Sequence, residues 1–258
     1  MDEETKKLLV ENLTLNTENN LMLHKLVSYQ KWNQIYRIFY WAIIILSAVG
    51  AFYYSQPYLN KILNLYSGIG GNRKNWKNVE VTSVEYNEEI ANIYRDFYPN
   101  DTVIVGDAHD FLEKHYKEYD FIWASPPCQS HSKVRLMASK RGSYDAVLPN
   151  MNLYSEIIFL KHFAECKWVV ENVVPYYEPL VKPTIKLDRH LLWSNFDIPF
   201  MDFEKPDVKH NKVTGKTDRY GININGYKIK HRKDQIIRNC VNPELGDYVL
   251  NCAIKEIK

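Results

Sequence analysis

The sequence predicts an α/β fold, a parallel sheet covered by helices, for the part of the chain that begins at residue 61. Two observations carry this prediction. From residue 61 to residue 173, short runs rich in β-branched and aromatic residues alternate with helical patterns. Before them, residues 38–60 contain no charged side chain, which separates a leader from the rest. We therefore expect a polar or amphipathic helical leader at 1–37, a candidate single transmembrane helix at 38–60 and a globular domain at 61–258.

Five runs in the globular domain are predicted to be strands, and three are predicted to be helices. The strands are residues 61–66, 79–85, 101–107, 119–125 and 167–173. The helices are residues 88–98, 109–116 and about 152–165. This alternation is typical of a parallel sheet with both faces covered, in which ligands bind beyond the carboxyl ends of the strands. Functional side chains are therefore expected where these strands end.

The apolar centre of the leader, residues 38–54, is long enough to make a membrane span plausible. As a helix at ~1.5 Å per residue it would extend roughly 26 Å, just short of the ~30 Å hydrocarbon core. Aromatic side chains stand near both ends, as in the belts of membrane helices. A buried core helix is one alternative, and a leader derived from a gene fusion or a wrongly assigned start is another. Residues 1–37 are expected to form a solvated or membrane-surface helix, with a coiled coil as the weaker alternative.

Composition places the chain among ordinary globular proteins. Hydrophobic residues make up 45% and charged residues 25%, unlike disordered or collagen-like chains. The net charge is only +2, from 33 basic and 31 acidic side chains, so a nucleic-acid surface would have to be a local patch. The four cysteines show neither CxxC pairs nor the dense spacing of a secreted disulfide framework. We therefore expect a reducing compartment and no bound metal.

The ends of the first three strands carry the residues of a nucleoside site. The first strand runs into a turn that contains Gly68, Gly70 and Gly71, where a ligand could approach the backbone closely. Glu85 ends the second strand and could accept hydrogen bonds from a ribose, and Asp107 follows the third. The lysine loop that binds a polyphosphate is absent from the sequence. We therefore expect an adenosine-containing ligand without a polyphosphate, the alternative being a simple tight connection.

The ends of the fourth and fifth strands carry a thiol and a carboxyl group. Pro126 and Pro127 stiffen the backbone before Cys128, which makes this thiol a candidate nucleophile. The alternative is a small buried hydrophobic residue. Glu171 follows an apolar run, where partial burial would raise its pKa toward that of a general acid. The pair predicts nucleophilic catalysis assisted by a proton donor.

These residues resemble a known enzyme family. The segments YSGIGG at 66–71, PPCQ at 126–129, ENV at 171–173 and RNCVNP at 238–243, with the acids Glu85 and Asp107, are similar in order and spacing to DNA cytosine-5 methyltransferases. The compact phage-type members are the most similar. The resemblance covers roughly residues 61–258 and implies a Rossmann-like S-adenosylmethionine-dependent methyltransferase sheet with a reduced target-recognition region.

The resemblance also implies a role for individual residues. Cys128 would add to carbon 6 of cytosine, and Glu171 would protonate ring nitrogen 3. Arg189 is the candidate for the arginine that orients the cytosine, although the usual arginine motif is absent here. Asn64 stands where many members carry an acid. S-adenosylmethionine is the implied cofactor, and the residues expected to contact it are Tyr66, Gly68, Gly70, Gly71, Glu85, Asp107, Ala108, Pro126, Asn239 and Val241.

Two basic segments are expected to contact DNA. Residues 130–148 are long and basic enough to be a mobile loop that fills the gap left by an extruded base. The region at about 200–235 is the predicted target-recognition region, and between residues 205 and 233 it has nine basic side chains against two acidic ones. The side chains assigned to DNA are Lys133, Arg135, Lys140, Arg141, Lys228, Lys230, Arg232 and Lys233.

The function predicted from the sequence is DNA cytosine-5 methylation through a covalent Cys128 adduct. An RNA cytosine-5 methyltransferase is one alternative, and a membrane-tethered, catalytically inactive nucleic-acid-binding protein is another. The expected partner is double-stranded DNA, with the membrane as a candidate partner through residues 38–60, and the expected oligomeric state is a monomer. Because DNA and S-adenosylmethionine are cytoplasmic, the catalytic domain is expected to face the cytoplasm.

Overall fold

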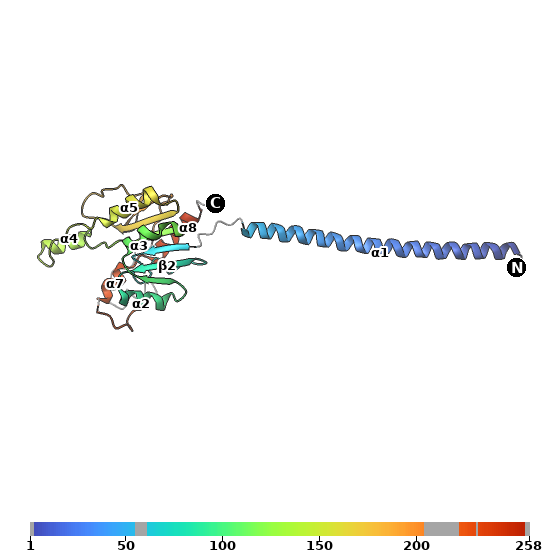
Figure 1. Ribbon diagram of the computed structural model, residues 1–258, viewed down its shortest axis with the longest axis horizontal. Coiled ribbons are helices and arrows are strands. Elements are labelled where there is room, and N and C mark those ends of the chain that lie inside the picture. The colour runs from blue at the N-terminus through green and yellow to red at the C-terminus, as the bar shows by residue number, and fades with distance from the viewer. Residues whose placement is uncertain (1–2, 55–60, 204–221, 231, 256–258) are drawn as a thin grey trace. The chain divides into compact units, whose positions relative to one another are not determined.

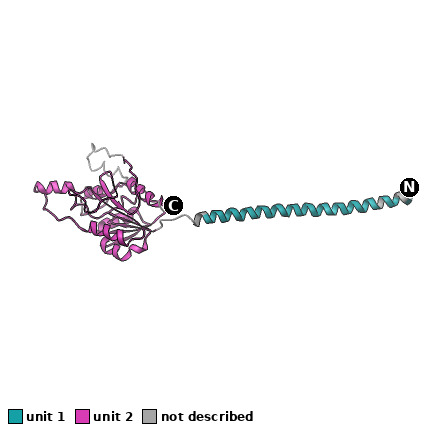
Figure 2. Cartoon of the chain, turned by 90° about the horizontal axis from the view of Figure 1, so that it is seen from above, with its two compact units in different colours: residues 1–56 teal, residues 57–258 magenta. Residues whose placement is uncertain are grey.

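The computed structural model describes residues 3–54, 61–203, 222–230 and 232–255. The chain divides into two compact units, Met1–Gln56 and Pro57–Lys258, shown in different colours in Figure 2. Two predictions fall partly outside the described residues: the span, at its end 55–60, and the basic region, at positions 204–221 and 231.

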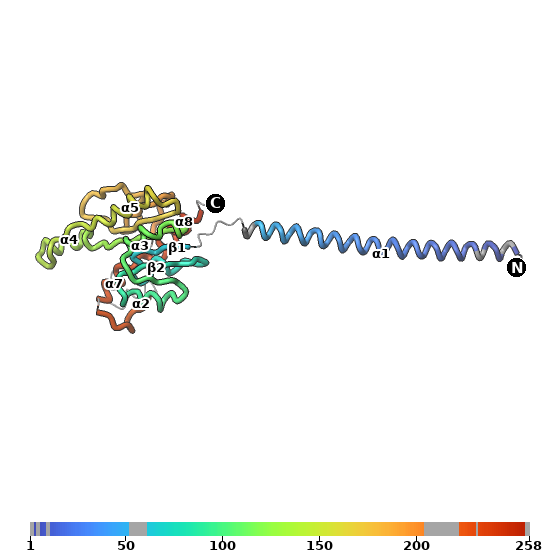
Figure 3. Tube along the Cα trace, viewed as in Figure 1, coloured from blue at the N-terminus to red at the C-terminus, as the bar shows by residue number. Residues whose placement is uncertain are grey.

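The first unit consists of one helix, α1, which runs from Glu3 to Tyr54 (Figure 3). The leader and the predicted span, which we separated at residue 38, therefore form one continuous helix. Its stretch Lys6–Ala51 contains an apolar window long enough to cross a membrane, and no residue of that window is buried in the structure. A core helix or a signal sequence can meet the same length and composition criteria, so the transmembrane assignment stays a prediction.

The second unit is built on a seven-stranded sheet with the strand order β3-β2-β1-β4-β5-β7-β6 (Figure 1). Strands β1 to β5 are parallel, β7 is antiparallel to β5, and β6 is antiparallel to β7. The strands are β1 (Lys61–Leu65), β2 (Glu80–Glu85), β3 (Thr102–Val105), β4 (Phe121–Ala124), β5 (Lys167–Val173), β6 (Ile185–Leu187) and β7 (His190–Ser194). The predicted α/β sheet is confirmed, with an antiparallel edge that the sequence pattern did not indicate.

The described helices of this unit include the three that were predicted. The helices are α2 (Glu88–Phe97), α3 (Ala108–His115), α4 (Lys133–Lys140), α5 (Asn152–Phe163), α7 (Lys233–Asn239) and α8 (Pro243–Lys255), with a short 3₁₀ turn, η1 (Tyr116–Glu118). Helix α4 occupies part of the segment at 130–148, for which the role of a mobile loop that fills the gap left by an extruded base stays a prediction. Good helix formers such as leucine, methionine, alanine and lysine fill α4, and none of its residues is buried.

The core lies on both faces of the sheet because successive strand residues point to opposite sides. Ile62 packs in a cluster with Leu245 and Val249 of α8. The next residue, Leu63, packs in a second cluster with Leu112 of α3 and with residues of α5. The sheet is therefore a buried middle layer, and its strand ends are held at one edge by packing on both sides.

Candidate functional site

The glycine-rich turn after β1 lies against the acid at the end of β2. The backbone N–H of Gly68 donates to Oε2 of Glu85 at 2.9 Å, and that of Asn87 donates to Oε1 at 3.0 Å. Tyr66, Gly68 and Gly70 all have positive φ angles, of 56°, 55° and 77°. Two of these three positions are glycines, which adopt this conformation without strain. The two predicted ligand-binding features, the turn and the acid, are thus brought together.

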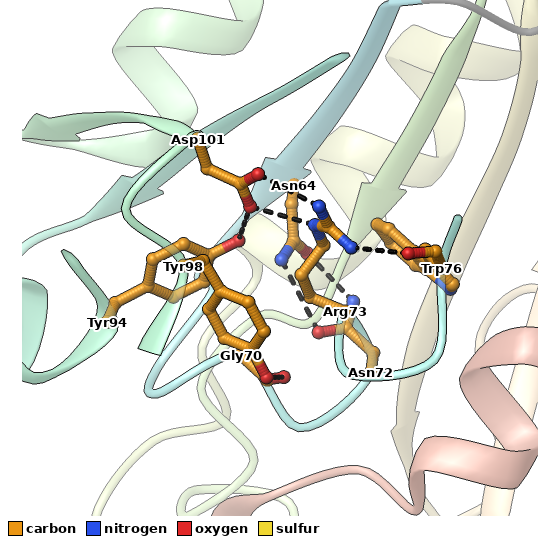
Figure 4. Close-up of polar contacts among 8 residues, drawn as sticks. All are labelled: Asn64, Gly70, Asn72, Arg73, Trp76, Tyr94, Tyr98 and Asp101. Carbon is orange, nitrogen blue, oxygen red and sulfur yellow. Dashed lines mark hydrogen bonds and ion pairs between the residues drawn. The ribbon is translucent and has the colours of Figure 1, made fainter. Parts of the chain in front are cut away.

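An ion pair between Arg73 and Asp101 holds the segment that follows the turn (Figure 4). The Arg73 guanidinium donates from Nε and Nη2 to the two carboxylate oxygens of Asp101, at 2.8 and 2.9 Å. The Tyr94 hydroxyl also donates to Asp101, at 2.9 Å. The Tyr98 hydroxyl donates to the carbonyl oxygen of Gly70 at 2.7 Å. The Arg73–Asp101 pair is bidentate, which is a strong form of charged hydrogen bonding. Together with the two tyrosine contacts, it connects the turn to α2 and to the residue before β3.

Asn64, the departure from the family pattern, has a structural role here. It is fully buried on β1, and its side-chain oxygen accepts a 2.8 Å hydrogen bond from the side chain of Asn72 (Figure 4). A buried amide needs such a partner, since an unpaired one costs about 1–3 kcal/mol. Asn64 therefore holds the residue that follows the turn.

The last family-like segment packs directly on the turn. A side chain at Gly71 would stand 2.6 Å from the carbonyl oxygen of Val241 and 2.9 Å from Cβ of Cys240. This proximity explains why a glycine is needed at position 71. The structure brings Val241 to the predicted cofactor site, whereas Asn239 lies exposed at the end of α7.

Asp107 lies at the strand edge as expected and also caps a helix. Its carboxylate accepts hydrogen bonds from the backbone N–H groups of His109 at 2.8 Å and Asp110 at 3.2 Å, so it is the N-cap of α3. Ala108, the next residue, is buried. Capping accounts for an acid here without a ligand, because it satisfies free N–H groups at the start of the helix. The cofactor role of both residues stays a prediction.

The thiol of Cys128 follows β4, on the same sheet edge. Burial, and to a smaller extent the charge of Glu171, raise its pKa to about 11, although the charge of Arg189 acts in the opposite direction. The thiol is therefore protonated in the free protein at neutral pH. The charges of Glu171 and Arg189 thus both act on the thiol, as expected for one site.

Glu171 lies on β5 and is only 5% exposed. Its Oε1 is 3.4 Å from Nε2 of His190, the first residue of β7. The neighbouring Asn172 donates from its side-chain nitrogen to the carbonyl oxygen of Pro126 at 2.9 Å. This hydrogen bond joins the end of β5 to the segment that carries Cys128. We did not predict a role for Asn172 or His190, since both contacts depend on how the strands pair.

Arg189 precedes β7 and is exposed. Its guanidinium donates to the carbonyl oxygen of Arg238 at 3.0 Å, so it also reaches the end of α7. The charge of Arg189 acts on the Cys128 thiol, and its guanidinium contacts the last family-like segment. The orienting role expected for Arg189 stays a prediction.

A buried acid that the sequence did not indicate lies beneath Tyr66. Glu156 of α5 is fully buried, accepts a short hydrogen bond from the Tyr66 hydroxyl and has its Oε1 3.2 Å from Nδ1 of His109. Burial raises the pKa of Glu156 to about 7, although its two partners act in the opposite direction. Burial, together with the charge of Glu156, also raises the pKa of Tyr66.

The predicted DNA-contacting side chains lie mostly on the surface. Lys133, Lys140 and Arg141 are exposed on or next to α4, and the Arg135 guanidinium lies 4.4 Å from the ring centre of Tyr144. Lys228, Lys230 and Arg232 are also exposed, and Arg232 pairs with Asp234 at 2.9 Å. Lys233 donates to the carbonyl oxygen of Asn225 at 2.8 Å.

Within the described residues, no cluster of three His, Cys, Asp or Glu side chains could hold a metal ion.

Comparison with known proteins gives one family match. Residues 60–175 match the model of the C-5 cytosine-specific DNA methylases. The comparison with curated proteins finds no match. Among solved structures, the Entamoeba histolytica methyltransferase EhMeth shares 18% identity over 45% of this chain and 38% of its own, with a TM-score of 0.30. A DNMT2 mutant from Spodoptera frugiperda shares 24% identity over 44% of this chain and 35% of its own, with a TM-score of 0.32. The chain thus spans well under half the length of these two structures.

Proposed function

Because the chain is a member of the C-5 cytosine-specific DNA methylase family through its domain at residues 60–175, we propose that it methylates carbon 5 of cytosine in DNA. Methyl transfer follows from the family. The proposal adds the DNA substrate and a covalent step through Cys128. The observation that carries it is that the thiol of Cys128 follows β4, that Glu171 is buried on the neighbouring strand β5, and that the charge of Glu171 acts on the thiol.

The residues at the first two strand ends fit the cofactor S-adenosylmethionine. Gly68 has a positive φ angle, and no heavy atom lies within 4 Å of the place where a Cβ would stand, so a ligand can lie close to its backbone, whereas Gly70 packs against the rings of Tyr98 and Tyr94. The carboxylate of Glu85 accepts backbone hydrogen bonds from Gly68 and Asn87, which hold it beside the turn, where it could accept hydrogen bonds from ribose hydroxyls. Bound there, the cofactor supplies a methyl group on a positively charged sulfur, which makes that methyl group electrophilic.

Cys128 performs the step that makes cytosine reactive. A base, such as a water molecule, takes the proton of the thiol, and the thiolate sulfur then forms a bond to carbon 6. The electrons of the 5,6 double bond move into the ring, and Glu171 gives a proton to ring nitrogen 3. Carbon 5 would then take up the methyl group, whose bond to the sulfur of the cofactor breaks. A base, such as a water molecule, removes the proton from carbon 5, the sulfur leaves carbon 6 as thiolate, and nitrogen 3 returns its proton to Glu171. No oxidant or reductant is needed.

The pKa of Cys128 fits a thiol that is activated only when substrate is bound. In the free protein, burial and the negative charge of Glu171 both oppose formation of the thiolate. A neutral, protonated Glu171, the form needed to donate to the ring, removes the second of these effects. Thiolate formation is thereby coupled to the protonation of its partner.

The exposed cations on and around α4 support a nucleic-acid substrate. Lys133, Lys140 and Arg141 follow Cys128 within a short stretch of chain, and none of them is buried. Neutralising phosphates near the thiol would hold a strand in place while the target base leaves the stack. Lys228 and Lys230 offer further exposed positive charge.

The test is to measure which methylated nucleoside the full chain produces. Duplex DNA and, separately, RNA are incubated with the protein and S-adenosylmethionine, digested to nucleosides and examined by mass spectrometry. We expect 5-methyl-2′-deoxycytidine from DNA and none with Cys128→Ala. Product from RNA alone would refute the DNA substrate, methylation of the amino group would refute the thiol mechanism, and nucleic-acid binding without product would favour the inactive binding protein.

We further propose that α1 anchors the catalytic domain to the membrane with the domain in the cytoplasm. The observation behind this proposal is the exposure of apolar side chains such as Ile43, Ile45 and Leu46 over a stretch without charge. Fractionation of cells that express the full chain should place it in the membrane pellet after an alkaline wash. The Ile43→Lys, Leu46→Lys double variant should be soluble. Recovery of the unaltered protein in the soluble fraction would refute the anchor.

A further inference from the structure

His190 faces the proposed proton donor from the neighbouring strand. In the antiparallel pairing of β5 and β7, Glu171 lies opposite Leu192. His190 is two residues from Leu192 and therefore points to the same face, in the diagonal position that a long side chain can reach. The result is a distance of 3.4 Å between His190 Nε2 and Glu171 Oε1, with both residues 5% exposed.

The surroundings of His190 select one form of its ring. Nδ1 is buried and has no hydrogen-bond partner among the described residues. Burial lowers the pKa of His190, so the ring is neutral at neutral pH and has one N–H. With the proton on Nε2, the N–H has a carboxylate oxygen 3.4 Å away, and the unpaired atom is only an acceptor. A proton on Nδ1 would instead leave a buried donor unpaired, which is more costly.

We propose that His190 is a positioning residue that donates from Nε2 to Oε1 of Glu171 and thereby leaves Oε2 for ring nitrogen 3 of the substrate. The proposal deepens the proposed function and rests on it, since a proton donor must be held in place to act on a ring. The 3.4 Å separation is longer than an ordinary hydrogen bond, and such contacts commonly shorten when substrate binds.

Three charged side chains act on the ring of His190. Besides Glu171 on β5, Asp188 and Arg189 act on His190 from the segment before β7. Asp188 raises and Arg189 lowers the pKa of His190, so these two act against each other. Among the named charges, Glu171 has the largest effect on the pKa of His190. Removing the charge of Glu171 should therefore lower that pKa further.

The first test does not depend on activity. The full chain, labelled with ¹⁵N in its histidines, is titrated by NMR, and the His190 signals are identified by their loss in His190→Gln. We expect a neutral ring with its proton on Nε2, and a lower His190 pKa in Glu171→Gln. His131, which is also buried and has its pKa lowered by burial, is the internal control and should not change. A proton on Nδ1, or a His190 pKa that is the same in Glu171→Gln and in the unaltered protein, would overturn the proposal.

The second test compares two variants of the same position. The side-chain amide of His190→Gln can still donate to Glu171, whereas His190→Leu cannot. We expect kcat on DNA to fall about 10- to 100-fold in His190→Leu, because the loss of one hydrogen bond to a charged group has an effect of this size. The KM for S-adenosylmethionine should not change. His190→Gln should recover most of the loss. Equal losses of kcat in His190→Leu and His190→Gln, with both variants folded, would contradict the positioning role. If the unaltered protein makes no methylated product, the proposed function is refuted, and the NMR titration still tests the contact between His190 and Glu171.

Discussion

Replacing Glu156 by glutamine is expected to remove most of one pH-dependent contribution to the stability of the second unit. Glu156 is fully buried and bonded to Tyr66, and burial raises its pKa from an ordinary 4.5 to about 7. The folded protein therefore binds this proton more tightly than the unfolded chain does. The stability from the protonated acid is complete below pH 4.5, falls as the pH rises through this window and is lost above pH 7.

The size of the effect follows from the shift itself. A difference of about 2.5 pKa units corresponds to about 3 kcal/mol at ~1.36 kcal/mol per unit. Glutamine has the shape of the protonated acid but no charge to bury, so it does not lose this stability at high pH. The free energy of unfolding of Glu156→Gln, minus that of the unaltered protein, should thus rise by about 3 kcal/mol between pH 4.5 and pH 8.

The assay is urea denaturation of both full-length proteins at several pH values, followed by near-UV circular dichroism from core aromatics such as Trp123. Taking the difference between the two proteins cancels the titrating groups that do not interact with Glu156. Glu118→Gln is the matched control, since that side chain is 61% exposed and its replacement removes no buried charge. A difference for Glu156→Gln that stays constant across this range would refute the reasoning.

Three further predictions concern the turn and the thiol. Gly71→Ala should destabilise the fold by about 1–3 kcal/mol and weaken cofactor binding, because the new methyl group would meet Val241 at 2.6 Å; an unchanged melting temperature with and without S-adenosylmethionine would contradict this packing. Asp101→Asn leaves the Arg73 guanidinium, whose side chain is 13% exposed, without its anion, and should cost about 3–5 kcal/mol in urea denaturation; a loss below about 1 kcal/mol would show that the pair is dispensable. Glu171→Gln should speed alkylation of Cys128 by iodoacetamide at pH 8, measured by mass spectrometry, because the negative charge that raises the pKa of the thiol is gone; an unchanged or slower rate would argue against this coupling.

The strands that carry the site could be predicted because each is a short apolar run followed by a distinctive side chain. Cys128 and Glu171 were identified in this way, since parallel strands deliver their ends to one edge. Strands β6 and β7 were missed: Ile185–Leu187 is only three residues long, and a pattern of period two needs more residues to be recognised. The edge they form is antiparallel, which the alternation of strands and helices does not indicate.

The contacts of His190 and Glu156 could not be predicted because they arise between segments far apart in the sequence. His190 meets Glu171 only through the pairing of β7 with β5. Glu156 lies in a largely apolar helix and becomes a partner of Tyr66 only when α5 packs on the sheet. The structural role of Asn64 could not be predicted either, because it depends on the hydrogen bond from Asn72, which forms only in the folded chain.

The central claim, a covalent bond between Cys128 and carbon 6 of cytosine in DNA, is tested most directly with 5-fluorocytosine. Fluorine at carbon 5 leaves no proton to remove after methyl transfer, so the thiol cannot depart and the adduct persists. A long duplex that carries 5-fluorocytosine at every cytosine position presents all target sequences at once. With S-adenosylmethionine, we expect a denaturation-resistant adduct that maps to Cys128, persists in Cys166→Ala and is absent from Cys128→Ala. Methylation of ordinary DNA without any such adduct, or an adduct on another cysteine, would contradict the mechanism.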